Sequence, residues 1–323
     1  MGKIDARAKE YFSDNKRFAD LCNFILFDGQ PVIEPKLLVE KDTTEVLSVF
    51  GADPKQIHIQ KWRDLLRGTV VRSFGDVCLV LIGMEAQANI HYAMPVKNMI
   101  YDALNYGYQV KEAVRKHRAC GEYADAEEFL SGFKASDKLT PVITITVYLG
   151  GEEWNAPRKL SDMYGKIDDR LQPFLQDFDA HVLVPREIAD FDGFHTSLKQ
   201  MFEILGTSTD RDAMEAMITS DKAFRELDNE TVHAINDFID AKIPVNKEGK
   251  VTDMCKAWKE QMQMGVEQGI ERGIEQGIEQ GRRSERLAAI CNMIELGLTK
   301  EQILQKYSEE DYTEAEQSML VQA

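Results

Sequence analysis

Apolar and polar positions follow helical periods in some parts of this chain and strand-like periods in others. From Asp5 to Phe27 apolar side chains recur at helical spacing, and either Asp14 or Asn15 can cap a second helical piece. The run CLVLIGMEAQ, residues 78–87, is nearly all apolar and then ends in polar residues, which is typical of a strand buried on both faces. With WRDLLRGTVVRS, residues 62–73, it predicts two antiparallel strands joined by a Ser-Phe-Gly-Asp turn.

Further elements surround this strand pair. Residues 29–38 contain two prolines and read as an extended connector, and residues 41–51 read as a short helix or a loop. A helix begins at Met94-Pro95, a polar loop with one helical turn covers 117–138, and the Val, Ile and Thr content of 139–151 predicts a strand. A helix, two or three strands, a helix and a strand indicate an α/β domain over 1–170, in which the last strand extends the same sheet.

The second half of the chain is predicted to be mainly helical. Residues 171–264 form a helical domain, with AHVLVP as a possible short strand. Residues 265–281 repeat Gly-x-Glu-Gln with glycine at every fourth position, which reads either as a helix that makes close helix-to-helix contacts or as a flexible, solvated linker. Residues 282–323 form a small tail of two amphipathic helices split at Gly297, where Thr299 and Gln302 resemble a capping box.

Composition and charge narrow the class of protein. The 323 residues are 43% apolar and 29% charged, as expected of a soluble globular protein. The formal charge of -16 argues against a generally basic nucleic-acid coat, but residues 1–170 carry only -2 of it. The five scattered cysteines form no disulfide or zinc pattern, and no stretch has the length of uninterrupted apolar residues that a membrane span needs. A cytoplasmic protein with reduced thiols is expected.

A local basic strip interrupts this near-neutral first half. It has two interpretations, a nucleic-acid contact beside a functional site or a solvated strand face. Its basic members outnumber the acids Asp53 and Asp64, and they are Lys55, Lys61, Arg63, Arg67 and Arg72.

Candidate chemistry gathers at the end of the buried strand. Glu85 and Gln87 point to the same side because side chains alternate along a strand, and antiparallel pairing can bring Asp64 back beside Glu85. Two carboxylates and a phosphate oxygen suffice for Mg²⁺ or another divalent cation, which makes Asp64 and Glu85 candidate metal ligands. The alternative is a pair of merely solvated acids. Lys97, in the first turn of the next helix, is either a catalytic or a solvated lysine.

Several motifs in order resemble one family. WRD, LVLIGMEAQANIHYAMPVKNMIYDALNY, LTPVITITVYLGGEEWNAPRKLSDM and the Gly repeats resemble the Rpn recombination-promoting nucleases, also described as transposases, of the PD-(D/E)xK superfamily. The resemblance implies a restriction-endonuclease-like mixed sheet flanked by helices. It makes Asp64 and Glu85 the motif acids and puts Gln87 where the superfamily has lysine, with Lys97 as the candidate substitute. Asp20 is a possible match for the acid that a first helix often supplies.

Three functions remain open at this point. The first is a Mg²⁺-dependent DNA endonuclease with catalytic residues Asp64, Glu85, Gln87 and Lys97 and a helical tail that either regulates or oligomerises the protein. The second is a nuclease-fold protein without turnover that binds DNA or protein, consistent with Gln87 and the acidic charge. The third, a transposase, draws only on the family label, because no residues here indicate end recognition or strand transfer.

Overall fold

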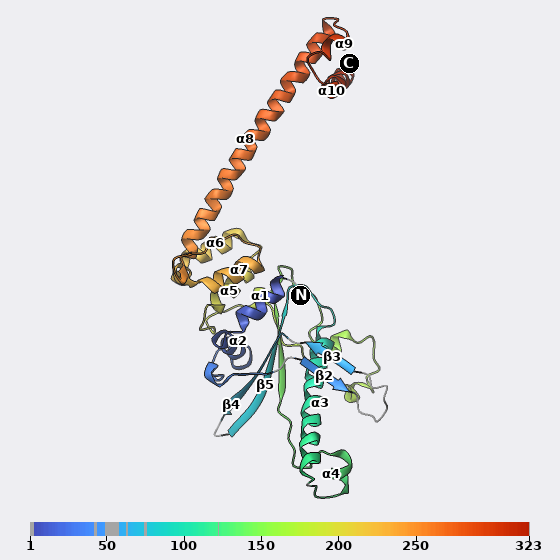
Figure 1. Cartoon of the computed structure of the whole chain (residues 1–323), viewed down its shortest axis with the longest axis vertical. Coiled ribbons are helices and arrows are strands. Elements are labelled where there is room, and N and C mark those ends of the chain that lie inside the picture. The colour runs from blue at the N-terminus through green and yellow to red at the C-terminus, as the bar shows by residue number, and fades with distance from the viewer. Residues whose placement is uncertain are drawn as a thin grey trace. The chain divides into compact units, whose positions relative to one another are not determined.

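Five strands form a mixed sheet in this computed structural model, which describes residues 3–41, 44–48, 58–62, 64–73, 76–121 and 123–322 (Figure 1). The strands, in their order across the sheet, are β1 (Val39–Glu40), β4 (Leu65–Ser73), β5 (Asp76–Gln87), β6 (Val142–Tyr148) and β7 (Val182–Leu183). The first three are antiparallel, whereas β6 runs parallel to both β5 and β7. The predicted α/β order is therefore confirmed, including the last strand that extends the same sheet.

Strand β5 is the longest strand of this sheet, and its burial changes along its length. The register with β4 runs from Leu65 opposite Met84 to Ser73 opposite Asp76, so the predicted antiparallel pair is confirmed; the two residues between them lie outside the described part. From Val80 onward the strand is mostly buried, but Leu79 is 60% exposed. The prediction of burial on both faces is wrong for this first part, because pairing with β6 begins only at Leu81.

Helices precede and follow the first strands of the sheet along the chain, and those at both places pack against it. They are α1 (Lys3–Phe12), α2 (Asn15–Phe27), α3 (Met94–Cys120) and α4 (Ala126–Ser131). Of the two predicted caps, Asp14 is the one used, because its side chain accepts from the amides that open α2. Helix α3 continues through His117–Cys120, which were predicted as loop, until Gly121 takes a left-handed conformation that ends it (φ 70°).

A separate hairpin replaces the helix or loop predicted over 41–51. Strand β2 (Thr44–Ser48) pairs antiparallel with β3 (His58–Trp62). Thr44 and Val46 are β-branched and favour strand, but the partner strand lies more than ten residues further along the chain, which local patterning cannot reveal. A short 3-10 helix, η1 (Pro35–Leu37), interrupts the predicted extended connector before β1.

The rest of the first compact unit, Met1–Ala257, is mainly helical, as predicted. Helix α7 packs against α1 and α5 against α2 (Figure 1). Helices from the segment predicted as a separate domain, 171–264, therefore share this unit with the sheet, and the unit ends at Ala257. Its remaining elements are η2 (Leu160–Met163), η3 (Gln172–Phe174), η4 (Pro185–Glu187), α5 (Leu198–Thr207), α6 (Arg211–Ser220), η5 (Lys222–Glu226), β8 (Leu227–Asp228), α7 (Asn229–Phe238) and β9 (Val251–Thr252).

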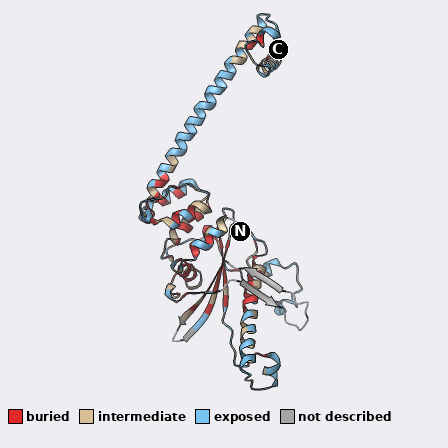
Figure 2. Cartoon of the chain, viewed as in Figure 1, coloured by how far each residue is buried: buried red, intermediate tan, exposed pale blue. Residues whose placement is uncertain are grey.

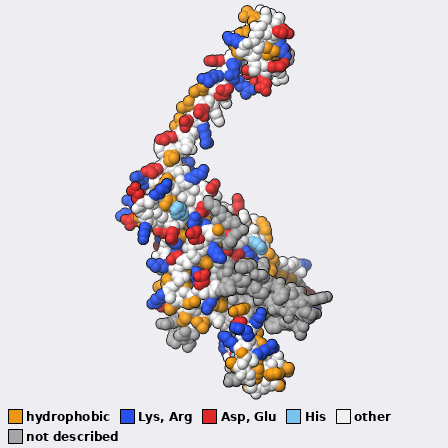
Figure 3. All heavy atoms as spheres, in the orientation of Figure 1, with side chains coloured by type: hydrophobic (Ala, Val, Ile, Leu, Met, Phe, Trp, Pro, Cys, Tyr) orange, Lys and Arg blue, Asp and Glu red, His pale blue; other side chains and the backbone are white. Residues whose placement is uncertain are grey.

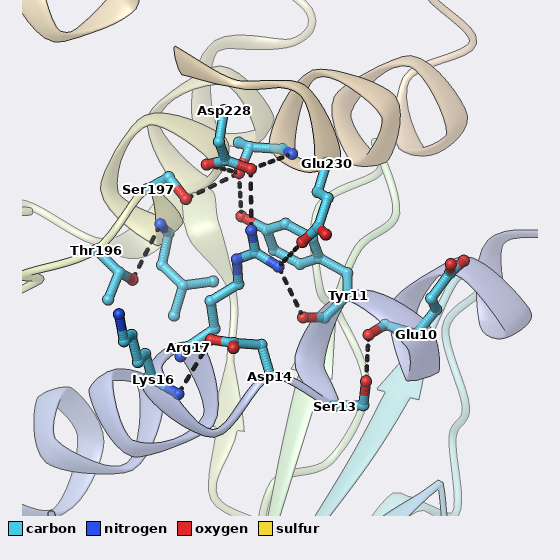
Figure 4. A network of polar contacts seen from close by, with 12 residues as sticks. Glu10, Tyr11, Ser13, Asp14, Lys16, Arg17, Thr196, Ser197, Asp228 and Glu230 are labelled. Carbon is cyan, nitrogen blue, oxygen red and sulfur yellow. Dashed lines mark hydrogen bonds and ion pairs between the residues drawn. The ribbon is translucent and has the colours of Figure 1, made fainter. Parts of the chain in front are cut away.

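A buried arginine ties the N-terminal helices to α7. Arg17 donates to Asp228 at 2.9 Å and to Glu230 at 2.8 Å, and its guanidinium lies 4.2 Å from the centre of the Tyr11 ring (Figure 4). The Tyr11 hydroxyl lies 2.9 Å from Thr231 Oγ1, and burial raises the pKa of Tyr11 to about 12. This network fixes α1 and α2 against the helical part of the unit.

The second compact unit, Trp258–Ala323, contains most of α8 (Met254–Glu295). Residues 265–281 are helical throughout, so the repeat forms a helix, and its residues are exposed to solvent, as the linker alternative also predicted (Figure 2). After Gly297 turns the chain (φ 82°), Thr299 and Gln302 form the predicted capping box of α9 (Lys300–Ile303). With α10 (Glu309–Gln322) these helices bury a small core around Ile290, Ile303 and Ala315. Among the described residues, no helix has both the length and the apolar character to cross a bilayer.

Candidate functional site

Asp64 and Glu85 meet where β5 approaches its carboxyl end. Asp64 directly precedes β4, and the pairing of Leu65 with Met84 brings it level with Glu85, as the sequence predicted. The amide of Ala86 donates to Asp64 Oδ2 at 2.8 Å, which holds this carboxylate beside the strand. Strands β5 and β6 are parallel, and ligands in open α/β sheets usually bind at the carboxyl ends of such strands.

Three side chains converge on one oxygen of Glu85. Lys97 Nζ lies 2.5 Å from Glu85 Oε1, and Gln87 Nε2 and the Tyr101 hydroxyl each lie 3.4 Å from it. Lys97 and Tyr101 are one turn apart on α3 and therefore face the strand together. The other oxygen, Oε2, is buried and accepts no hydrogen bond of regular geometry from the described residues.

Burial and mutual repulsion shape the electrostatics of this acid pair. Glu85 is only 6% exposed, and burial, followed by the charge of Asp64, raises its pKa, while Lys97 opposes the increase. Burial also raises the pKa of Asp64, against the Ala86 amide and Lys97. Both carboxylates therefore ionise less readily than free acids, and a nearby cation would stabilise their charged forms.

Helix α1 brings two charged residues toward this site that the sequence analysis missed. The charge of Asp5 raises the pKa of Asp64, and the charge of Lys9 lowers it, after the larger effects of burial, the Ala86 amide and Lys97. The two residues lie one turn apart, and α1 packs against β5. Their spacing alone gives no signal of this role, because only the tertiary packing of α1 brings them near Asp64.

The structure places Asp20, the suggested first-helix acid, elsewhere. Asp20 is buried on α2, where it accepts hydrogen bonds from the amides of His195 and Thr196 and from the Thr196 hydroxyl. It therefore fixes the loop that leads into α5. The assignment of Asp20 to the metal site is wrong because α2 directs this side chain toward the helical part of the unit.

The basic strip also differs from the expectation. Arg67 is buried, donates to the Ser13 carbonyl oxygen at 3.2 Å and lies 3.4 Å from Glu40, so it is not available as a surface contact for nucleic acid. The charge of a residue in a strand gives no indication that helices such as α1 and α2 lie over the face of the sheet to which that residue belongs. Of the other residues in this stretch, Asp53, Lys55 and Arg63 lie outside the described part of the chain, and the side chains of Lys61 and Arg72 are not described either.

The donor set fits a hard divalent cation with open coordination positions. Among the described residues no group of three or more His, Cys, Asp or Glu side chains gathers in a way that could hold a metal. Asp64 and Glu85 thus offer two carboxylates, of which Glu85 Oε2 accepts no hydrogen bond of regular geometry from the described residues. Mg²⁺ is commonly bound through one or two carboxylates together with water and phosphate oxygens, so this pair suits it.

Comparison with known proteins adds no relative: no family model, curated protein or solved structure matches this chain. The likeness to a nuclease family therefore depends on the motifs in the sequence, and the chemistry of the site depends on its own geometry.

Proposed function

We propose that this protein is a divalent-metal-dependent DNA endonuclease of the Rpn type, and that its strand breaks promote recombination in the cytoplasm. The observation that carries the proposal is the pair of half-buried Asp64 and buried Glu85 near the end of β5, where Glu85 Oε2 accepts no hydrogen bond of regular geometry from the described residues. The order of helices and strands around this pair is consistent with the restriction-endonuclease-like fold that the motifs imply.

The residues of the site have distinct roles in this proposal. Asp64 and Glu85 would hold Mg²⁺, which would polarise a phosphodiester and lower the pKa of a coordinated water. Lys97 opposes the rise in the pKa of both carboxyls and so favours their ionised forms for binding. Gln87 directs its amide nitrogen to the carbonyl oxygen of Ala86 at 2.9 Å, which leaves its amide oxygen to accept from and orient the attacking water.

Gln87 stands in the place of the superfamily's lysine, and substitutions there test this division of roles. Gln87→Lys is expected to lower cleavage, because a second ammonium group would approach the Glu85 oxygen that Lys97 already contacts. Gln87→Ala is expected to lower it less than loss of either acid. Initial cleavage rates at fixed Mg²⁺ measure both changes. A Gln87→Lys protein faster than the parent would show that Lys97 does not fill the lysine's role.

A second candidate function is DNA or protein binding without turnover. It is favoured by the short contact between Lys97 and Glu85, which satisfies one oxygen of the acid pair without any metal. Incubation with supercoiled plasmid separates the two candidates: the endonuclease nicks or linearises it with Mg²⁺ and not with EDTA, whereas the binding protein retards it under both conditions. Asp168→Asn, which changes an exposed carboxylate outside the site, is the matched control for variants of the acids.

We also propose that a second copy of the chain packs on the Gly-repeat helix. Ile270, Ile274 and Ile278 are each more than half exposed on one side of α8, where Figure 3 shows apolar side chains along the helix. The glycines beside them, at 269, 273 and 277, have open space around them, so another helix can approach closely. An apolar stripe that no described residue covers is consistent with assembly between protomers.

Replacing these glycines separates helix stability from assembly. The triple change Gly269→Ala, Gly273→Ala and Gly277→Ala is expected to raise helix stability by about 3 kcal/mol in total. The same change is expected to shift sedimentation toward the monomer, because the added methyl groups keep a second helix further away. Gln268→Ala with Gln276→Ala, on the same helix, is the control. A triple variant that sediments like the parent would remove the glycines from the interface.

A further inference from the structure

A groove with basic walls lies in the helical part of the first unit and shares no residue with the acid pair. Its volume is about 850 Å³, within the range of ligand sites. It lies between the start of α5, the short helix η5 and the residues that lead into α7. Its charged and titratable side chains are His195, Lys199, Lys222, Arg225, Glu226 and Asp228.

One wall presents two cations from a fixed platform. Lys222 and Arg225 are three residues apart on η5, and side chains at this spacing in a 3-10 helix project from the same side. Phe224 and Leu227 are buried beneath them, and Asp221 caps the helix by accepting from the Ala223 amide at 2.8 Å. Lys222 and Arg225 are exposed, and neither forms an ion pair with another residue that the structure describes.

The opposite wall is held by α2. Asp20 binds the amides of His195 and Thr196 at 2.8 to 3.0 Å and the Thr196 hydroxyl at 2.6 Å. Lys199 follows in the first turn of α5 and contacts the largely exposed Asp192. The buried carboxylate of Asp20 thus orders a loop that carries an imidazole and leads to an ammonium group.

The acids of the groove offset little of this positive charge. Asp228 is already occupied by Arg17 at 2.9 Å and by the amide and hydroxyl of Thr231 (Figure 4). Helix α5 begins at the groove, and helix N-termini carry partial positive charge, whereas the N-terminus of α7 is already capped by Asp228. Lys199 is offset by its ion pair with Asp192. Glu226 is therefore the remaining acid of the lining, against Lys222 and Arg225.

We infer that this groove binds the phosphate groups of a DNA strand, an inference that rests on the proposed endonuclease function. Exposed point charges and the N-terminus of α5 suit phosphodiester oxygens and position a strand without reading its sequence. The aromatic side chain in the lining, Phe194, is buried and stacks on Phe24 with ring centres 3.9 Å apart, so it is not available to stack on a base. The groove therefore holds the backbone of the substrate, in the same compact unit as Asp64 and Glu85.

The test is DNA binding by the full-length protein in EDTA, where cleavage does not interfere. Fluorescence anisotropy with labelled duplex and single-stranded DNA is measured over a series of KCl concentrations. For Lys222→Ala with Arg225→Ala, we expect binding roughly tenfold weaker at about 0.1 M salt and a logarithmic salt dependence shallower by about 2. Lys222→Arg with Arg225→Lys keeps both charges and is expected to bind like the parent.

A matched control removes two positive charges elsewhere. Lys138 and Lys166 are exposed in the same unit and form no ion pair with the described residues. Changing both to alanine is expected to leave affinity and salt dependence close to those of the parent. An equal loss in the control, or unchanged affinity and slope in the Lys222 and Arg225 double variant, would overturn the inference.

Two further measurements separate the sources of phosphate and the two proposals. Calorimetry with inorganic phosphate and with a mononucleotide identifies a small-molecule site: binding that the double variant loses while DNA affinity stays unchanged would overturn the DNA assignment. Groove-dependent DNA binding by a protein that never cleaves supports this inference and contradicts the endonuclease. DNA cleavage that is unchanged in the Lys222 and Arg225 double variant supports the endonuclease and contradicts this inference.

Discussion

Asp64→Asn and Glu85→Gln are each expected to lower Mg²⁺-dependent DNA cleavage by at least about a hundredfold, because loss of residues that merely support metal ligands already costs 10–100-fold. Both substitutions preserve side-chain shape. An asparagine at position 64 can still accept the hydrogen bond from the Ala86 amide, so its effect would come from the lost charge. Initial rates on supercoiled plasmid over a range of Mg²⁺ concentrations measure the loss.

The same substitution at position 64 is expected to leave the metal-free protein at least as stable as the parent at neutral pH. Burial raises the folded-state pKa of Asp64 above its ordinary value of 3.8. The folded state therefore holds this proton more tightly than the unfolded chain, and stability falls as the pH rises from the unfolded to the folded pKa. Asparagine does not undergo this loss. Thermal unfolding of both proteins in EDTA, at a pH above the folded-state pKa of Asp64, checks the expectation. A large drop in the Tm of Asp64→Asn would make Asp64 a structural residue.

Lys97→Met is expected to destabilise the protein by about 2–3 kcal/mol and to shift the acid limb of the pH-rate profile to higher pH. Removing one partner of a buried ion pair costs 3–5 kcal/mol, and the partial exposure of Lys97 reduces this figure. Lys97 lowers the pKa of both Asp64 and Glu85, so without it both carboxyls ionise only at higher pH. Urea unfolding and kcat/KM as a function of pH measure the two effects.

Two variants control for this result. Lys97→Arg keeps the positive charge and is expected to keep the acid limb near that of the parent. Lys111→Met removes an exposed lysine from the same helix and is expected to change stability by less than about 0.5 kcal/mol. An acid limb that stays in place in Lys97→Met would mean that this lysine does not control ionisation of the acid pair.

Much of the sheet, and the meeting of Asp64 with Glu85, was predictable from the sequence. The apolar run of β5 and its short connection to β4 specify an antiparallel pair, and the pairing of Leu65 with Met84 follows from this hairpin. The Val, Ile and Thr residues of β6 and the Met94-Pro95 start of α3 are equally local signals. Lys97 approaches Glu85 because α3 begins only a few residues after β5 ends.

The errors arose where packing between distant segments decides the outcome. Asp5 and Asp20 lie in neighbouring helices, and the packing of α1 on β5 and of α2 on the loop before α5 distinguishes their roles. The sequence pattern is compatible with Arg67 as a surface cation, but in the structure this arginine is buried and donates to the carbonyl oxygen of Ser13. The Gly repeat has low helix propensity, yet its residues continue a helix of 42 residues.

The most direct test of the central claim is plasmid cleavage by the parent protein and by Asp64→Asn, each with Mg²⁺ and with EDTA, beside the exposed control Asp168→Asn. We expect nicked or linear DNA from the parent and from Asp168→Asn with Mg²⁺, and intact plasmid from both in EDTA and from Asp64→Asn under either condition. Folded Asp64→Asn that cleaves as fast as the parent, or a parent protein that leaves the plasmid intact with Mg²⁺, would contradict the assignment of Asp64 and Glu85 as the metal-binding acids of an endonuclease.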